Sequence, residues 1–231
     1  MRPISFACMA FVVCGSVAVS TQTTADQVKQ KAVAAKEAAA RNQQALQSYS
    51  WISKTSLSVK GEVKNTKIES NQYGPDGKVV KTELSEPPEP PAKARGLKGK
   101  IVAKKVGEMK EELAKSTALV HSYLPPAAEK LQAVIAAGKV TVTPSPGATV
   151  LRFADYQKAG DSLTLTLDPE AKAMRKVSVD TWLDDPKEKV TLDVTFTSLP
   201  DGTSYAGLTL LKIPGSNIEV KIENSNYQKI R

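Results

Sequence analysis

The C-terminal half of the chain alternates apolar and polar residues through a series of short segments, and this alternation constrains the fold more than any other feature. In the stretch "LDVTFTSLPDGTSYAGLTL", Leu192, Val194 and Phe196 share one face of a strand, with polar residues between them. Pro200-Asp201-Gly202 supplies a turn before a second strand. Connections this short leave no room for crossover helices, so neighbouring strands should run antiparallel. The strands expected here are 139–143, 148–156, 162–167, 174–183, 189–198, 204–213 and 217–228.

The same period of two begins earlier, at Tyr49, and predicts a strand up to Val59. Residues 63–72 continue as a second strand, the turn sequence "YGPDGK" follows, and 79–84 form a third. About ten strands result. Antiparallel sheets of this size usually limit their exposed edges by curling into a barrel, a half-barrel or a sandwich.

Two regions of the sequence have helical character instead. Residues 26–47 are rich in strong helix formers and carry a thin alanine stripe, which predicts a helix lying flat against the sheet; a frayed N-terminal arm is the alternative. Residues 85–100 form a proline-rich, basic linker, after which apolar residues recur at helical spacing. They are Val102, Val106, Met109, Leu113 and Val120, then Leu131, Val134 and Ile135 in a shorter helix.

The expected fold class is therefore α+β, mainly antiparallel β. We expect a curved half-barrel of about ten strands, covered by the N-terminal helix and by the helices of an insertion at 85–138.

The first residues resemble an export signal. Arg2 precedes a mostly apolar run, 4–19, that is short for a membrane span, and this predicts a signal peptide over 1–25. Cleavage after Ala25 is the preferred site, and Ser16-Val17-Ala18 offers an alternative. The expected location of the mature chain is periplasmic, or secreted.

Both cysteines, Cys8 and Cys14, lie inside the predicted signal peptide. The mature chain would then have no cysteine for a disulfide, a thiol nucleophile or a metal site; lipidation of Cys14 is the alternative use of that residue. Residues 26–231 are expected to form a single domain. Removing Arg2 leaves 31 basic against 24 acidic residues, a formal charge of +7.

No residue constellation points to catalysis. His121 is the single histidine, and the sequence contains no Gly-x-Ser-x-Gly nucleophile motif. Asp180, Asp184 and Asp185 match no calcium loop, and the acids before Pro186 are ordinary turn residues. "GLKGK" at 96–100 lacks the spacing of a phosphate loop. We therefore expect no enzyme, no metal and no cofactor.

A basic cluster is the strongest electrostatic feature of the sequence. Six positive charges lie within residues 93–105, which contain no acid, around the start of a predicted helix where the helix dipole would favour acids. Contact with an anionic membrane surface explains this order, and a solvated linker is the alternative. An exported chain meets lipid head groups rather than nucleic acid. The cluster consists of Lys93, Arg95, Lys98, Lys100, Lys104 and Lys105.

The apolar positions of the expected strands form a broad aliphatic face, which the predicted helices would either seal or leave as a cavity. The candidate cavity residues are Trp51, Leu57, Val59, Leu163, Leu165, Leu167, Val177, Val179, Leu192, Val194 and Phe196.

The order of parts resembles the LolA/LolB-like periplasmic lipoprotein-carrier superfamily. The stretch "ALQSYSWISKTSLSV" leads from a helix into a first meander, inserted helices and a second meander follow, and the closing strand ends in "NYQKI". The resemblance implies an incomplete barrel that binds acyl chains. The long proline-rich insertion and the low aromatic content, 5%, depart from the typical carriers.

Two functions are compatible with these features. The first is a lipid or lipoprotein carrier that binds an acyl chain, a lipid or a lipidated protein in an apolar concave face. The alternative is a non-catalytic envelope interaction module with a packed core and a basic, proline-rich recruiting loop. The sequence sets no oligomeric state.

Overall fold

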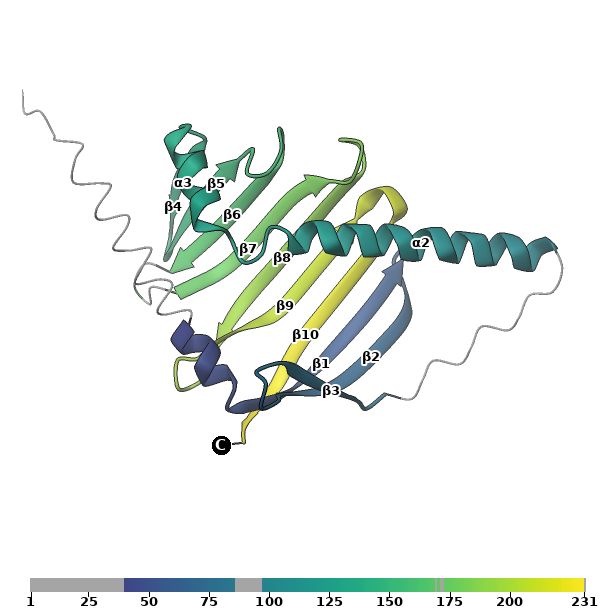
Figure 1. Cartoon of the computed structure of the whole chain (residues 1–231), viewed down its shortest axis with the longest axis horizontal. Helices are drawn as coiled ribbons and strands as arrows, with labels where there is room; N and C mark the ends of the chain where they lie inside the picture. Colours follow the sequence, from purple (N-terminus) through teal and green to yellow (C-terminus); the bar gives the residue numbers. More distant parts are fainter. Residues whose placement is uncertain (1–39, 86–96, 169, 171–172, 231) are drawn as a thin grey trace, which may run out of the picture. The chain divides into compact units, whose positions relative to one another are not determined.

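The computed structural model describes residues 40–85, 97–168, 170 and 173–230. These residues form ten strands and two insertion helices, preceded by a helical segment at 40–46 (Figure 1). The strands are β1 (Tyr49–Val59), β2 (Glu62–Tyr73), β3 (Val79–Glu83), β4 (Val140–Ser145), β5 (Ala148–Ala154), β6 (Ser162–Asp168), β7 (Ala173–Trp182), β8 (Lys189–Ser198), β9 (Ser204–Ile213) and β10 (Ile218–Lys229). The helices are α2 (Leu97–His121), α3 (Ala128–Ala136) and a short 3₁₀ turn, η1 (Pro214–Ser216).

All ten strands belong to one antiparallel sheet, in the order β3-β2-β1-β10-β9-β8-β7-β6-β5-β4. The first and last strands pair in its interior, from Tyr49 opposite Lys229 to Val59 opposite Ile218. Of the described strands, β3 and β4 lie at the two ends of the order and do not pair with each other, so the sheet stays open. This arrangement confirms the predicted fold class, a mainly antiparallel half-barrel with helices.

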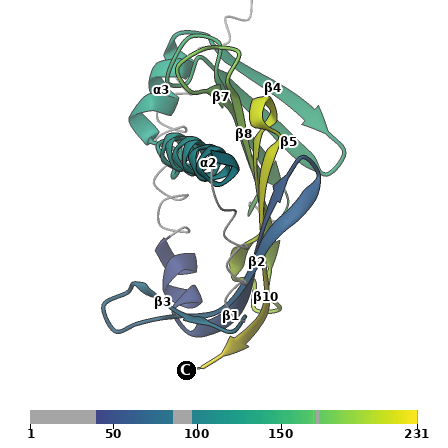
Figure 2. The same ribbon diagram turned by 90° about the vertical axis from the view of Figure 1, so that its right-hand side faces the viewer.

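The helices lie on one face of the sheet, which we call the inner face; the opposite face is the outer face (Figure 2). The insertion helices α2 and α3 contain the two apolar series expected from the sequence. Of the helix predicted at 26–47, residues 40–46 are helical, and 26–39 lie outside the described residues.

The main core lies between the two insertion helices and strands β5 to β9. It forms because every second residue of each strand is apolar and points to the inner face, where helical side chains cover it. Leu163 and Val190 are fully buried within it. The buried members are Val120, Tyr123, Val134, Phe153, Tyr156, Leu163, Leu165, Val177, Val179, Val190, Leu192, Val194 and Leu211.

A buried polar contact joins the chain after α2 to the loop between β5 and β6. Tyr123 donates its hydroxyl to Asp161 Oδ2 at 2.5 Å and lies 2.9 Å from Thr181 Oγ1. Asp161 is 1% exposed and also accepts the backbone N–H groups of Gln157 and Lys158. Burial, followed by the Asp161 contact, raises the pKa of Tyr123 far above its ordinary value. These bonds fix the end of α2 over the sheet.

Candidate functional site

The strand pairing brings all candidate cavity residues to the inner face. Leu57 on β1 lies opposite Val220 on β10, and Val220 lies opposite Leu211 on β9. The same row continues across the sheet through Leu192, Val179 and Leu163. Side chains opposite each other in antiparallel strands share a face, so the apolar surface is continuous from β1 to β6.

The helices seal one half of this surface, which we call the sealed half: the inner face of β5 to β9. Leu163 and Val179 are 0% and 2% exposed there, and Val194 is 7% exposed. The remaining candidates on these strands are buried or half-buried and contact core residues or neighbouring strands: Leu165, Leu167, Val177, Leu192 and Phe196. These side chains already have packing partners.

The inner face of β10, β1 and β2, which we call the open half, is different. Trp51, Leu57 and Val59 are half-buried there, whereas Ile218, opposite Val59 on β10, is 3% exposed. Among the described residues, the main core and the apolar side chains packed against it include Val220 of β10 but nothing from β1 or β2. Within the part of the chain that the structure describes, part of the aliphatic and aromatic surface on the open half therefore remains exposed.

An aromatic cluster occupies one end of the open half. The Trp51 ring stacks on Tyr227 at a centroid distance of 5.6 Å and lies 5.5 Å from Tyr73. Tyr205 lies 4.1 Å from Tyr227. Burial raises the pKa of Tyr73 and, more strongly, of Tyr227. Sequence analysis identified Trp51 but missed the three tyrosines, because their meeting depends on the pairing of β1 with β10.

A chain of side-chain hydrogen bonds crosses the open half beside these aromatic rings. Asn71 Nδ2 donates to Ser53 Oγ at 2.8 Å, Ser53 Oγ donates to Asn224 Oδ1, and Asn224 Nδ2 donates to the Ala206 carbonyl at 2.8 Å. Each donor fixes the orientation of the next group. No local sequence pattern predicts this series of hydrogen bonds, since its members come from four different strands.

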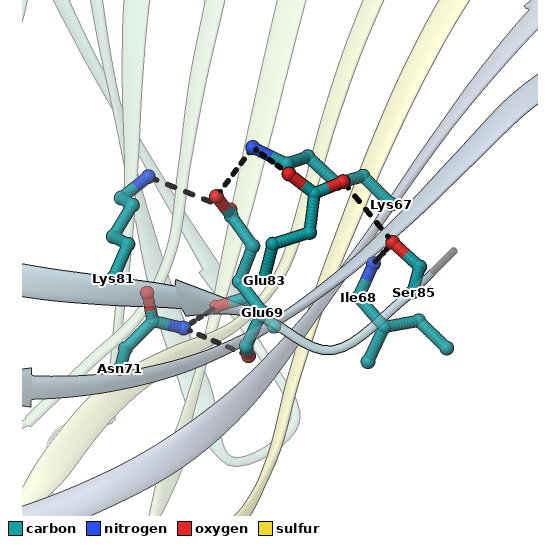
Figure 3. Close-up of polar contacts among 8 residues, drawn as sticks. Lys67, Ile68, Glu69, Asn71, Lys81, Glu83 and Ser85 are labelled. Atoms are coloured by element: carbon teal, nitrogen blue, oxygen red, sulfur yellow. Dashed lines mark hydrogen bonds and ion pairs between the residues drawn. The ribbon is translucent and has the colours of Figure 1, made fainter. Parts of the chain in front are cut away.

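Towards β3 the open half becomes ionic (Figure 3). Glu69 is 8% exposed and lies 2.8 Å from Lys67 and 3.7 Å from Lys81, while Lys67 also lies 3.4 Å from Glu83. The hydrogen bond from Lys67 is the largest cause of the lowered pKa of Glu69. Because two acids and two lysines occupy this part of the inner face, the apolar surface of the open half lies mainly on β1 and β10.

The apolar stripe of α2 extends beyond the sealed half. Val120 is 2% exposed and Leu113 is half-buried, but Val106, on the same stripe, is 40% exposed. The helix is straight (Figure 1), so these residues stay in line along it. Among the residues that the structure describes, its N-terminal part therefore exposes apolar side chains, including Ile101 and Val106.

Only part of the predicted basic cluster can be placed. Lys104 and Lys105 are exposed on α2, and Lys104 lies 3.7 Å from Glu108. Lys98 and Lys100 belong to α2, but their side chains lie outside the described residues. Lys93 and Arg95 lie outside the described residues entirely, so their place in the basic cluster stays a prediction.

Two surface depressions have volumes of about 280 Å³ each. One lies beside α3 and includes Lys130, Lys139 and Asp155; the other includes Lys212 and Glu219 near η1. Neither contains a predicted cavity residue, and both have charged linings.

The described residues contain no group of three or more His, Cys, Asp or Glu side chains placed to hold a metal. In the same ranges, no helix is both long enough and apolar enough to cross a membrane. Asp184 and Asp185 lie in a turn where their backbone N–H groups donate to Glu188.

Hydrogen bonds tie the helical segment 40–46 and the start of β1 to the β8–β9 turn. Asn42 exchanges two hydrogen bonds with the Ser204 backbone, at 2.7 and 2.6 Å. Tyr49 donates its hydroxyl to Asp201 Oδ2 at 2.6 Å. The Tyr49 contact, followed by the bonds from Thr203, lowers the pKa of Asp201 to about 2.

We expect Asp201 to titrate near pH 2 in the folded protein, and the Tyr49→Phe variant to raise this pKa toward the ordinary 3.8. A carboxyl with a lowered pKa stabilises the fold above its unfolded pKa, so this contribution is lost as the pH falls from about 3.8 to about 2. Carboxyl-carbon NMR titration measures both values. A wild-type pKa of 3.8 would show that the Tyr49 bond does not form in solution.

Comparisons with known proteins add a distant similarity of fold. No protein-family model matches the chain, and no curated protein matches it. A crystal structure of a DUF1329 family protein from Desulfovibrio piger is similar at 11% identity and a TM-score of 0.38, over 83% of this chain and 90% of that one. Similarity at this level gives no information on ligand or activity, and membership of the LolA/LolB-like superfamily stays a prediction.

Proposed function

We propose that this protein is a non-catalytic binding protein of the cell envelope that holds an acyl chain, from a lipid or a lipidated protein, on the open half of its inner face. The observation that supports this function is the unequal cover of one continuous apolar face. The helices bury the sealed half, whereas Trp51 and Leu57 on the open half stay accessible.

The affinity would come from burial of the acyl chain, at about 0.8 kcal/mol per methylene group. The floor of the site would be Leu57, Val59 and Val220, with the Trp51 aromatic cluster at one end. The part of α2 that crosses the sheet would cover the acyl chain from the helix side (Figure 1). Exchange of the ligand would then require movement of α2 and no covalent chemistry.

Intrinsic tryptophan fluorescence tests the location of this site, because the two tryptophans lie on different parts of the sheet. Trp51 belongs to the open half, and Trp182 lies under Lys158 at a distance of 4.4 Å. Palmitate should produce a saturable blue shift in the Trp182→Phe variant, which retains Trp51. The matched Trp51→Phe variant should show no shift. A shift confined to Trp182, or none in either variant, would reject the proposed site.

The basic cluster would hold the protein at an anionic membrane during loading or release. Replacing its six basic residues by Gln should abolish binding to phosphatidylglycerol vesicles in a flotation assay, since each basic residue near such a surface contributes about 1 kcal/mol. A control with the same change in charge replaces six exposed lysines elsewhere: Lys54, Lys60, Lys64, Lys78, Lys187 and Lys229. Equal loss in both variants would mean that net charge, and not the cluster, determines binding.

A second function is favoured by the dense packing of the sealed half. If the open half also closes in solution, the protein would be an envelope interaction module whose basic, proline-rich loop recruits a protein or an acidic polymer. This module would not respond to palmitate at either tryptophan but would still lose partner binding in the six-residue Gln variant.

A further inference from the structure

The two end strands of the sheet differ in their capacity to pair with another chain. At the start of β4, the Ala154 N–H donates to the Lys139 carbonyl, so the odd-numbered residues from 139 onward form the backbone hydrogen bonds to β5. The even-numbered residues, which include Pro144, direct their backbone groups away from β5. Proline has no N–H to offer a partner strand. This edge is therefore blocked near the C-terminal end of β4.

The β3 edge carries no such block. Bonds from Gly74 N–H to the Lys78 carbonyl and from Leu84 N–H to the Ile68 carbonyl show that the even-numbered residues of β3 bond to β2. The backbone N–H and C=O groups of Val79, Lys81 and Glu83 therefore face outward. All five residues of β3 are exposed. Among the described residues, no other strand pairs with this edge. An unpaired strand edge of this kind is a template for strand addition.

We propose that β3 pairs with β3 of a second copy of this chain, antiparallel, about a two-fold axis through Thr82. In this register, Lys81 of each copy exchanges two backbone hydrogen bonds with Glu83 of the other, and their opposite charges meet on the inner face. On the outer face, Val80 lies opposite Leu84; these side chains are 48% and 57% exposed in the single chain.

The charge pattern selects this register over its neighbours. Only odd-numbered residues offer outward backbone groups, so odd-numbered residues of the two copies must lie opposite each other. An axis through Val80 would place Lys81 opposite Val79 and form no ion pair. An axis at Lys81 would oppose two lysines, and an axis at Glu83 would oppose two glutamates, both unfavourable. The axis at Thr82 replaces both repulsions by two Lys–Glu pairs. The dimer is independent of the proposed ligand, since β3 lies outside the acyl-binding strands.

Cysteine cross-linking tests the register. In a Cys8→Ser, Cys14→Ser background, Thr82→Cys places two thiols at a non-hydrogen-bonded pair, where Cα atoms approach to about 4.5 Å and a disulfide can form. Mild oxidation should convert this variant to a covalent dimer. The matched Val80→Cys variant should stay monomeric on a non-reducing gel, because its thiol faces Leu84. Equal cross-linking of the two variants would overturn the register.

Sedimentation of the uncross-linked protein tests the dimer itself. The wild type should show a concentration-dependent monomer–dimer equilibrium. Lys81→Pro removes one outward N–H per copy without removing a bond to β2, and should raise the dissociation constant roughly thirtyfold through the loss of two hydrogen bonds. An unchanged circular dichroism spectrum verifies its folding. A wild type that stays monomeric at all concentrations, or a proline variant that dimerises equally well, would overturn the proposal.

Discussion

The Asp161→Ala variant is expected to lose about 3–5 kcal/mol of its free energy of unfolding. Asp161 is 1% exposed and accepts hydrogen bonds from Tyr123 and from the backbone N–H groups of Gln157 and Lys158. Removing the carboxylate leaves the two backbone N–H groups without this acceptor, takes away the main partner of the buried Tyr123 hydroxyl, and releases the end of α2 from the β5–β6 loop. Urea unfolding followed by circular dichroism measures the change.

Asp155→Ala is the matched control in the same loop. Its carboxylate is about one-third exposed, at 33%, and contacts Lys139 and Gly160 near the surface, so loss of these contacts should cost roughly 1 kcal/mol or less. Alanine at the positive φ of this residue, 53°, should add about 1 kcal/mol. A double-mutant cycle that combines Asp161→Ala with Tyr123→Phe measures the interaction free energy between Tyr123 and Asp161. If Asp161→Ala unfolds at the same urea concentration as Asp155→Ala, the buried contact does not hold α2 in place.

The second large effect is expected on ligand affinity. Leu57→Asp places a carboxylate in the floor of the open half and removes a leucine contact, so the dissociation constant for palmitate should rise about 10- to 100-fold. The fluorescence titration of Trp51 measures this constant. The sealed half is not touched by the substitution, and the unfolding midpoint should change little.

Val63→Asp provides the control for added charge. Val63 lies opposite Ser58 in the β1–β2 pairing. Because Ser58 follows Leu57 in the strand, Ser58 and Val63 point to the outer face, where Val63 is 62% exposed. Its substitution should leave the affinity for palmitate unchanged. If both variants bind as tightly as the wild type, the acyl chain does not lie on β1.

Much of the fold could be predicted because its strands are short, alternating and separated by strong turn residues. The strands expected at 189–198 and 204–213 have the same bounds as β8 and β9. The turn at Pro200-Asp201-Gly202 explains this agreement, since proline and glycine fix where the first strand ends and the next begins. The helical spacing from Val106 to Val120 identified α2 in the same way.

The parts of the candidate site that depend on long-range pairing could not be predicted. The sequence shows that Leu57 and Leu163 each belong to an apolar strand face, but not that the helices seal only the second. Ser53, Asn71 and Asn224 resemble ordinary strand residues, and they meet only because β10 inserts between β1 and β9. Local patterns specify which side of a strand is apolar, whereas strand order determines which strands the helices reach.

Native mass spectrometry of protein exported to a bacterial periplasm and purified without detergent tests acyl binding most directly. We expect a bound mass above that of the polypeptide, and organic extraction should release an acyl lipid. The Leu57→Asp variant should lose this mass, whereas Val63→Asp should keep it. A wild-type protein that carries no lipid and binds none when phospholipid is added would contradict acyl binding and leave the interaction module as the function.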